Sequence, residues 1–222
     1  SVSQALRYVP GTLSESRPSA RYDSVFMRGF GGFGQTTNFI QYLDGLKLPR
    51  GLSYLVPSID PYLLERIDVV RGPNSVLYGQ VNPGGLINQI TRRPRSENIN
   101  ETFVTIGTNK RKAIGFDFGR KLSEDGTLTG RITGVVRDAN SQSGIDDKRY
   151  ALAPSWTWQP DDATTLNISA WLQKDPDGGD YNGIPGIGTL LPHALGKLRY
   201  NAFIGEPDFE KFDRNISSVA YL

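Results

Sequence analysis

Residues 65–94 read ERIDVVRGPNSVLYGQVNPGGLINQITRRP, and this stretch decides the fold of the chain. Two turn signals, Gly72-Pro73 and Pro83-Gly84-Gly85, separate its short apolar runs, and a basic Arg92-Arg93-Pro94 cluster ends it. Glycine permits a positive φ and proline fixes its own φ, so both residues favour tight turns. The stretch therefore predicts a series of short strands joined by turns.

The overall composition narrows the class of protein. The 222 residues carry 25 Lys and Arg against 23 Asp and Glu, a balance that does not indicate nucleic-acid binding. Cysteine is absent and His193 is the single histidine, which excludes a disulfide framework, a thiolate nucleophile and a zinc site. With 25 Gly and 14 Pro, the chain favours turns and strands over long helices.

The two parts of the chain have different patterns. Residues 1–98 contain short apolar runs separated by loops rich in Gly, Pro or Asp, and a proline at the start of Pro61–Glu65 predicts a short helix there. This part predicts a small mixed α/β domain. Residues 99–222 instead alternate between apolar and polar side chains with period two, which predicts strands of roughly 9–13 residues.

The strand 128–137 illustrates the alternation, because two faces of different character can be assigned to it. One face carries Leu128, Gly130, Ile132, Gly134 and Val136, and the other carries Thr129, Arg131, Thr133, Val135 and Arg137. A soluble antiparallel sandwich alternates in the same way as a membrane barrel.

The connections between these strands favour the barrel. The segments 123–126 and 159–162 predict tight turns, 138–148 predicts a longer connection, and 175–214 predicts a very long loop. Short turns at one rim and long loops at the other are typical of outer-membrane barrels, where Trp156 and Trp158 would lie in an interfacial girdle.

These residues resemble the TonB-dependent outer-membrane receptors. Residues 65–94 follow the plug motif of the siderophore branch, and Tyr22–Phe30, Leu43–Leu48 and Ile59–Tyr62 resemble further plug segments. Residues 115–118 and 149–154 resemble the first barrel strands of ferric-hydroxamate receptors of the ferrichrome and ferrioxamine type.

The resemblance implies a fold and two domains. It predicts an α+β plug domain over residues 1–98, with its N-terminal part missing, followed by antiparallel strands of a transmembrane β-barrel over 99–222. About six strands are expected, against the 22 or so of a complete plugged barrel, so the barrel in this chain is incomplete. The chain is accordingly expected to be an internal fragment.

The resemblance also implies a function, namely a bacterial outer-membrane receptor that binds and imports a ferric siderophore, of the hydroxamate type. Such a protein is no enzyme and needs no cofactor, because iron arrives inside its ligand. The expected partners are the ferric siderophore, outer-membrane lipid or lipopolysaccharide, and the TonB–ExbB–ExbD energy-coupling complex, reached through an N-terminal box absent here. No nucleic-acid partner is expected. The alternatives are the same fold with haem, cobalamin or a catecholate siderophore as cargo, and a soluble β-rich carbohydrate-binding or adhesion module.

Ligand-binding residues follow from the same resemblance. The substrate-binding positions are Arg17, Gly34, Gln35, Tyr54 and Tyr181. An arginine offers a fork of donors to hydroxamate oxygens, a glutamine can donate and accept, and a tyrosine provides an aromatic wall with a polar tip. Gly183 stands where the family has a tryptophan, so the aromatic wall beside Tyr181 is thinner.

Two further predictions concern charged and glycine-rich segments. Because charges that face a barrel lumen need partners, ion pairs between plug and barrel wall are expected for Glu65, Arg66, Arg71, Arg92 and Arg93. Residues 29–34 formally satisfy the dinucleotide-binding pattern G-x-G-x-x-G, but prolines and glycines that follow exclude the helix that such a site requires.

Overall fold

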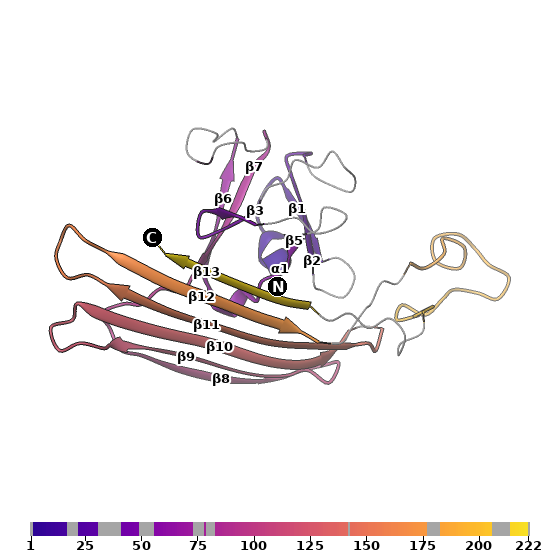
Figure 1. The fold of residues 1–222 in the computed structure, drawn as a ribbon. Coiled ribbons are helices and arrows are strands. Elements are labelled where there is room, and N and C mark those ends of the chain that lie inside the picture. Colours follow the sequence, from indigo (N-terminus) through magenta and orange to yellow (C-terminus); the bar gives the residue numbers. More distant parts are fainter. Residues whose placement is uncertain are drawn as a thin grey trace.

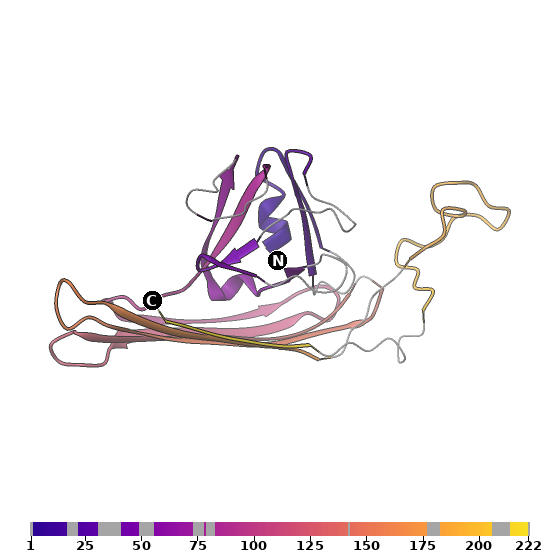
Figure 2. The ribbon, with the colours of Figure 1, turned by 45° about the horizontal axis from the view of Figure 1, so that its top comes forward.

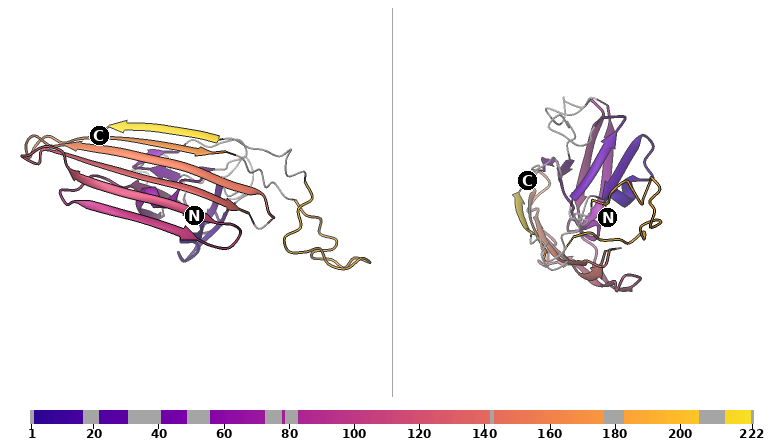
Figure 3. Two further views of the ribbon diagram at one scale, coloured as in Figure 1. Left: turned by 90° about the horizontal axis from the view of Figure 1, so that it is seen from below. Right: turned by 90° about the vertical axis from the view of Figure 1, so that its right-hand side faces the viewer.

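The computed structural model describes residues 2–16, 22–30, 41–48, 56–72, 78, 83–141, 143–176, 183–205 and 214–221. A smaller N-terminal part stands on one face of a broad six-stranded sheet (Figures 1 and 2). Seen from the side, this sheet curves around the smaller part (Figure 3). Below, the wall denotes the broad sheet, and the plug denotes the described residues between 2 and 95.

The plug contains one short α-helix, a 3₁₀-helix and two small sheets. Helix α1 (Val2–Leu6) contacts a three-stranded sheet of order β1–β2–β5, formed by Thr12–Ser16, Tyr22–Met27 and Val56–Pro57. The second sheet has the order β4–β3–β7–β6, formed by Leu46–Lys47, Gln41–Leu43, Gly85–Thr91 and Leu64–Arg71. Strands β3 and β7 run parallel, whereas the other pairs of this sheet are antiparallel.

The helix predicted over Pro61–Glu65 is shorter than expected. The structure has the 3₁₀-helix η3 (Pro61–Leu63), whose first turn is capped by the Asp60 side chain, which accepts a hydrogen bond from the Tyr62 amide. Strand β6 starts at Leu64 and pairs with β7, with a bulge between Leu64 and Arg66. From Leu64 onward the backbone groups form hydrogen bonds with β7, so they are not available to extend the helix.

The wall is an antiparallel meander in which each strand pairs with the next along the chain. Its order is β13–β12–β11–β10–β9–β8. The strands are Ile99–Ile106, Lys112–Lys121, Leu128–Asn140, Asp146–Trp158, Leu166–Asp175 and Arg214–Tyr221, numbered β8 to β13. The described residues thus contain the six wall strands that the sequence predicts, and they do not close into a barrel.

The connections at the two rims differ less than predicted. At one rim, 122–127 and 159–165 are short, as expected. At the other rim the predicted longer connection over 138–148 is wrong, because β10 and β11 stay paired as far as Asn140 and Asp146. Only 141–145 joins them, and 107–111 is equally short. The rim asymmetry therefore rests on the long connection 176–213.

The two faces of the wall separate as the alternation predicts. On β10, Arg131, Thr133 and Val135 are buried against the plug, whereas Ile132 and Val136 are 38% and 44% exposed on the opposite face. The outward side chains of the neighbouring strands are also large and apolar, among them Ile114, Trp156, Ile168 and Leu172. The polar side chains thus face the plug, which is the reverse of a soluble sandwich.

The plug and the wall share one hydrophobic core. The fully buried side chains of α1, β2 and η3 cluster with inward residues of the wall, namely Val135, Ala151, Ala153 and Trp171. Because they share this core, the plug and the wall are not separate globules. On the inward face, Gly115 leaves space for the ring of Phe103, since a Cβ at this position would lie 2.2 Å from that side chain.

Helices of the described residues are too short and too polar to cross a membrane.

Candidate functional site

The predicted substrate-binding residues Arg17, Gly34, Gln35, Tyr54 and Tyr181 all lie outside the described residues. Their role therefore stays a prediction. The described residues contain a different set of functional contacts, which join the plug to the wall in two polar clusters.

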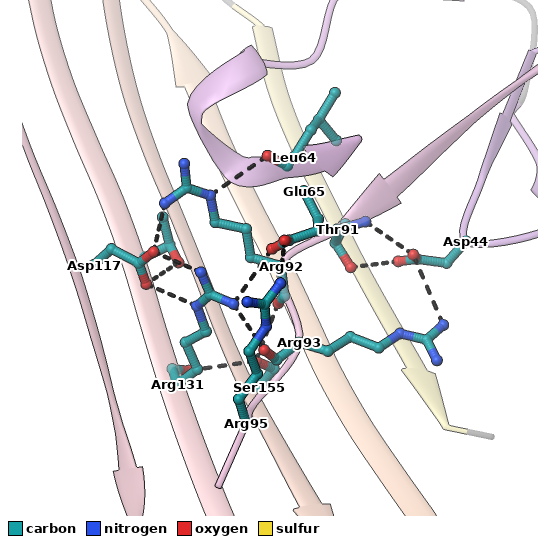
Figure 4. A network of polar contacts seen from close by, with 11 residues as sticks. Asp44, Leu64, Glu65, Thr91, Arg92, Arg93, Arg95, Asp117, Arg131 and Ser155 are labelled. Carbon is teal, nitrogen blue, oxygen red and sulfur yellow. Dashed lines mark hydrogen bonds and ion pairs between the residues drawn. The ribbon is translucent and has the colours of Figure 1, made fainter. Parts of the chain in front are cut away.

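The first cluster is centred on Asp117 of β9 (Figure 4). Arg131 of β10 binds its carboxylate with two hydrogen bonds, from Nε to Oδ1 at 2.8 Å and from Nη2 to Oδ2 at 2.7 Å. Thr133 donates to Oδ1 at 3.0 Å, and Arg92 of the plug donates to Oδ2. The Asp117 side chain is 1% exposed and that of Arg131 is 6% exposed. These four residues, together with Glu65, are called the Asp117 cluster.

The Asp117 cluster also contacts the main chain of the plug just after β7. Arg131 donates from Nη1 to the carbonyl oxygen of Arg93 at 2.8 Å, and Ser155 of β11 donates to that of Arg92 at 3.5 Å. Arg92 in turn donates to the Leu64 carbonyl at 3.4 Å (Figure 4). The segment that leaves the plug is thus bound through its backbone as well as through a side chain.

The ion pairs predicted between plug and wall are confirmed for two residues. Arg92 pairs with Asp117, and Glu65 lies 3.5 Å from Nη1 of Arg131. Two others were assigned wrongly, because Arg66 pairs with Asp68 at 3.0 Å and Arg93 with Asp44 at 3.9 Å, both inside the plug. Arg66 thus pairs with a carboxylate of its own strand, and Arg93 with one in the turn between β3 and β4, and neither pair involves the wall. For Arg71 the pairing stays a prediction.

The second cluster is centred on Asp60, the residue that caps η3. Its Oδ2 accepts a hydrogen bond from Arg137 at 3.1 Å and lies 3.6 Å from Nη1 of Arg149. Arg149 also donates to Asp175 at 2.5 Å. The side chains of Asp60, Arg149 and Asp175 are at most 5% exposed. These residues and Gln173 are called the Asp60 cluster.

Gln173 of β12 binds main-chain atoms of the plug. Its Nε2 donates to the Ser58 carbonyl at 3.0 Å, and its Oε1 accepts from the Asp60 amide at 3.2 Å. The primary amide therefore pairs with the plug backbone as a neighbouring strand would. A further hydrogen bond from Nε2 to Asp175, at 2.9 Å, orients it.

Tyr62 lies between the two clusters. Its hydroxyl donates to Glu101 of β8 at 3.1 Å, its ring meets the Phe103 ring edge-on at 4.6 Å, and the Arg92 guanidinium lies 4.5 Å from the ring centroid. Burial, with the hydrogen bond to Glu101 as the next cause, raises the pKa of Tyr62 to about 12.

An open polar pocket of about 730 Å³ lies beside Tyr62, between the plug and strands β8 to β11. Both clusters reach it, through Asp60, Arg92 and Arg137. No group of three or more metal-ligating side chains occurs among the residues that the structure describes.

Sequence reasoning missed the wall side of both clusters. Asp117, Arg149, Gln173 and Asp175 were not singled out, although each occupies an inward position of a strand whose outward positions are apolar. A polar residue at the buried positions of such a strand is the signal that could have found them.

Comparison with known proteins identifies the family. The TonB-dependent receptor plug domain matches residues 1–86. The ferrichrome outer membrane transporter/phage receptor of Escherichia coli K12 is 41% identical over the whole of this chain. The chain belongs to the TonB-dependent receptors. It is also 40% identical, over its full length, to the ferrioxamine B receptor of Salmonella typhimurium SL1344. The chain spans 30% of the length of the first relative and 32% of the second.

Solved structures agree with this TonB-dependent receptor fold. The closed form of the ferric-catecholate import receptor Fiu of E. coli K12 covers 99% of this chain with a TM-score of 0.78 at 22% identity, using 31% of its own length. The ferripyoverdine receptor of Pseudomonas aeruginosa covers 99% with a TM-score of 0.78 at 17% identity, using 29% of its length. The predicted fold class, a plug with an incomplete set of barrel strands, is confirmed.

The family assignment also tests two other predictions. The curated relatives are a transporter and receptors, which confirms that the chain is no enzyme. The outer-membrane location predicted from the sequence is likewise confirmed.

Proposed function

We propose that this TonB-dependent receptor binds a ferric siderophore of the hydroxamate type and imports it across the bacterial outer membrane. The observation that carries the proposal is the identity of about 40%, along the whole chain, to receptors named for ferrichrome and for ferrioxamine. Ferrichrome and ferrioxamine are both ferric hydroxamates. Relatives named for a catecholate siderophore are 26% identical, which favours the hydroxamate cargo over the catecholate one.

The proposed partners follow from the family. The ferric siderophore binds from outside, and the TonB–ExbB–ExbD complex supplies energy through an N-terminal box. Outer-membrane lipid or lipopolysaccharide surrounds the wall, and the apolar outward side chains of β9 to β12 support this contact. Iron enters as part of the ligand, so the receptor holds no cofactor of its own. The proposed domains are a plug at 1–98 and barrel strands at 99–222.

The proposed ligand site combines plug loops with the long loop after β12. Arg17, Gly34, Gln35 and Tyr54 would contact the chelate from the plug, and Tyr181 from the wall. The connection 176–213 is long enough to fold over a ligand at that rim. Hydrogen-bond donors and aromatic faces suit a chelate whose iron is already enclosed in oxygen atoms.

A ligand panel tests the proposal. Fluorescence titration of the receptor in detergent should show saturable binding of cyclic or linear ferric trihydroxamates. Weaker binding is expected for a ferric catecholate, haem and cobalamin. Binding of one of those three, with no response to any hydroxamate, would overturn the proposed cargo.

Substitution of the predicted contacts sharpens the same test. Gln35→Ala and Tyr54→Ala should each weaken ferric hydroxamate binding by about tenfold or more, since each removes a contact to the chelate. The matched control is Gln159→Ala, an exposed glutamine in the opposite rim. If Gln35→Ala and Tyr54→Ala both bind the chelate with unchanged affinity, the assignment of these contact residues is wrong, even where the cargo is right.

A further inference from the structure

A two-residue turn between Met27 and Phe30 ends the plug motif that starts at Tyr22. The Met27 amide donates to the Phe30 carbonyl at 2.8 Å, and the Phe30 amide donates to the Met27 carbonyl at 2.9 Å. The central residues Arg28 and Gly29 have φ values of 52° and 82°, and tight two-residue hairpins require such positive values. Arginine rarely adopts a positive φ, so the Met27–Phe30 turn holds a conformation that local preference does not favour.

The Met27–Phe30 turn packs against two glycines that leave no room for a side chain. A Cβ on Gly84 would lie 2.5 Å from the carbonyl oxygen of Met27. A Cβ on Gly85 would lie 2.1 Å from the carbonyl oxygen of Val70 and 2.7 Å from Sδ of Met27. Because Cβ atoms do not approach backbone oxygen atoms so closely, a larger residue at either position would force the backbone to shift.

The residues that flank the segment 31–40 both lie on one stretch of the plug, 84–89, which is called the platform. Phe30, before the segment, belongs to the turn that packs on the platform. Gln41, after the segment, pairs with β7, and its side chain accepts a hydrogen bond from Gln89 at 2.9 Å. Gln41 and Gln89 are each 1% exposed. The platform therefore fixes both the start and the end of this segment.

We propose that the platform and the Met27–Phe30 turn position the segment 31–40 for siderophore binding, with Gly84 as the positioning residue. The segment contains Gly34-Gln35, which are two of the proposed ligand contacts. Gly34 is the fourth residue after Phe30, and four extended residues span at most about 14 Å. A shift of the turn therefore displaces the region that Gly34 can reach. Gly84 acts through the turn and touches no ligand, and the inference rests on the proposed function.

The first test separates ligand affinity from stability. Gly84→Ala should weaken ferric hydroxamate binding by about tenfold in fluorescence titrations of the full-length receptor in detergent, because the turn has to move. The matched control is Leu63→Ala, at a fully buried residue of η3 outside both the turn and the platform. It should lower the Tm at least as much as Gly84→Ala does, with affinity within about twofold of the parent receptor. Unchanged affinity in Gly84→Ala, or an equal loss in Leu63→Ala, would overturn the proposal.

The second test uses the positive φ of Arg28 and remains informative if Gly84→Ala folds poorly. Arg28→Asn and Arg28→Val both remove the guanidinium, but asparagine tolerates a positive φ far better than a β-branched residue does. Arg28→Val should therefore bind ferric hydroxamate at least about fivefold more weakly than Arg28→Asn. Since the charge is lost in both variants, it cannot cause this difference. Equal affinities of the two variants would contradict a positioning role for the turn.

The outcomes also distinguish this inference from the proposed function. A parent receptor that binds no ferric hydroxamate would overturn the proposed function. A parent receptor that binds the chelate, with Gly84→Ala binding it equally well, would overturn only the positioning role. Loss of affinity in Gly84→Ala and Arg28→Val, with smaller changes in Leu63→Ala and Arg28→Asn, would support both.

Discussion

The Asp117 cluster and the Asp60 cluster join the same plug to the same wall with different arrangements of charge. At the Asp117 cluster the plug supplies a cation, Arg92, to Asp117 of the wall, and an anion, Glu65, to Arg131 of the wall. At the Asp60 cluster the plug supplies the anion, and Arg137 and Arg149 of the wall supply the cations. A plug seated in another orientation would bring like charges together, so the pair of clusters specifies one orientation.

The clusters also differ in what they bind. The Asp117 cluster depends on a buried carboxylate shared by two arginines, whereas the Asp60 cluster includes Gln173, a neutral side chain that binds main-chain atoms of the plug at Ser58 and Asp60. Loss of the Asp117 carboxylate leaves the buried charge of Arg131 without this partner. Loss of the Gln173 amide leaves two neutral backbone groups, at Ser58 and Asp60, without theirs. The two clusters should therefore respond unequally to substitution.

The largest effect is expected for Asp117→Ala. Removing this carboxylate leaves Arg131 buried without its two-bond partner, which should lower the free energy of unfolding by about 3–5 kcal/mol. Thermal unfolding in detergent measures the change. Asp162→Ala, an exposed carboxylate in the turn between β11 and β12, should change it by less than about 0.5 kcal/mol. If Asp117→Ala and Asp162→Ala lower the free energy of unfolding by similar amounts, the Asp117 cluster does not stabilise the plug against the wall.

A smaller loss, about 1–3 kcal/mol, is expected for Gln173→Ala, because the Ser58 carbonyl and the Asp60 amide lose their partners. Gln173→Glu is the sharper variant. It keeps an acceptor for the Asp60 amide but places a second carboxylate beside Asp175, so it should be no more stable than Gln173→Ala. Amide hydrogen exchange at residues 58–62 should become faster in both variants, because this plug segment loses its hydrogen bonds to the wall. Slow exchange there in both variants would mean that Gln173 does not hold the plug.

The smallest effect concerns Tyr62, which connects the clusters. Its pKa is raised to about 12, so the folded receptor favours the protonated phenol. The stabilisation is fully present below the unfolded pKa of about 10 and is lost as the pH rises through 12. Wild type and Tyr62→Phe should therefore converge in thermal stability between these pH values. Tyr200→Phe, at a tyrosine that is 87% exposed, should run parallel to wild type throughout.

The sequence allowed the faces of the wall to be predicted, because period-two alternation is a local property of each strand. Arg131 and Val135 were assigned to one face and Ile132 and Val136 to the other, as found. The connection at 138–148 was predicted wrongly because its polar residues look like a loop. In the structure they continue the ladder, with Asn140 paired to Asp146.

The partners of charged residues were harder to predict, because they depend on tertiary contacts. Arg92 and Arg93 are adjacent and identical in type, yet the first reaches Asp117 of the wall and the second stays near Asp44. Which carboxylate each arginine reaches depends on where the end of β7 lies relative to Asp117 of β9 and to Asp44 in the β3–β4 turn. The ligand-contact residues came from family resemblance alone, since an Arg, Gln or Tyr on a polar loop has no distinctive local pattern.

The hydrogen bonds from wall side chains to plug carbonyl and amide groups have an evolutionary consequence. Arg131 and Gln173 contact atoms that every plug residue possesses, at Arg93 and Ser58, whatever side chain stands there. A saturation mutagenesis experiment should accordingly find position 93, whose side chain is 46% exposed, more permissive than positions 131 and 173. The wall strands would then carry most of the selective constraint at this boundary, and the plug position that they bind through its backbone would vary more.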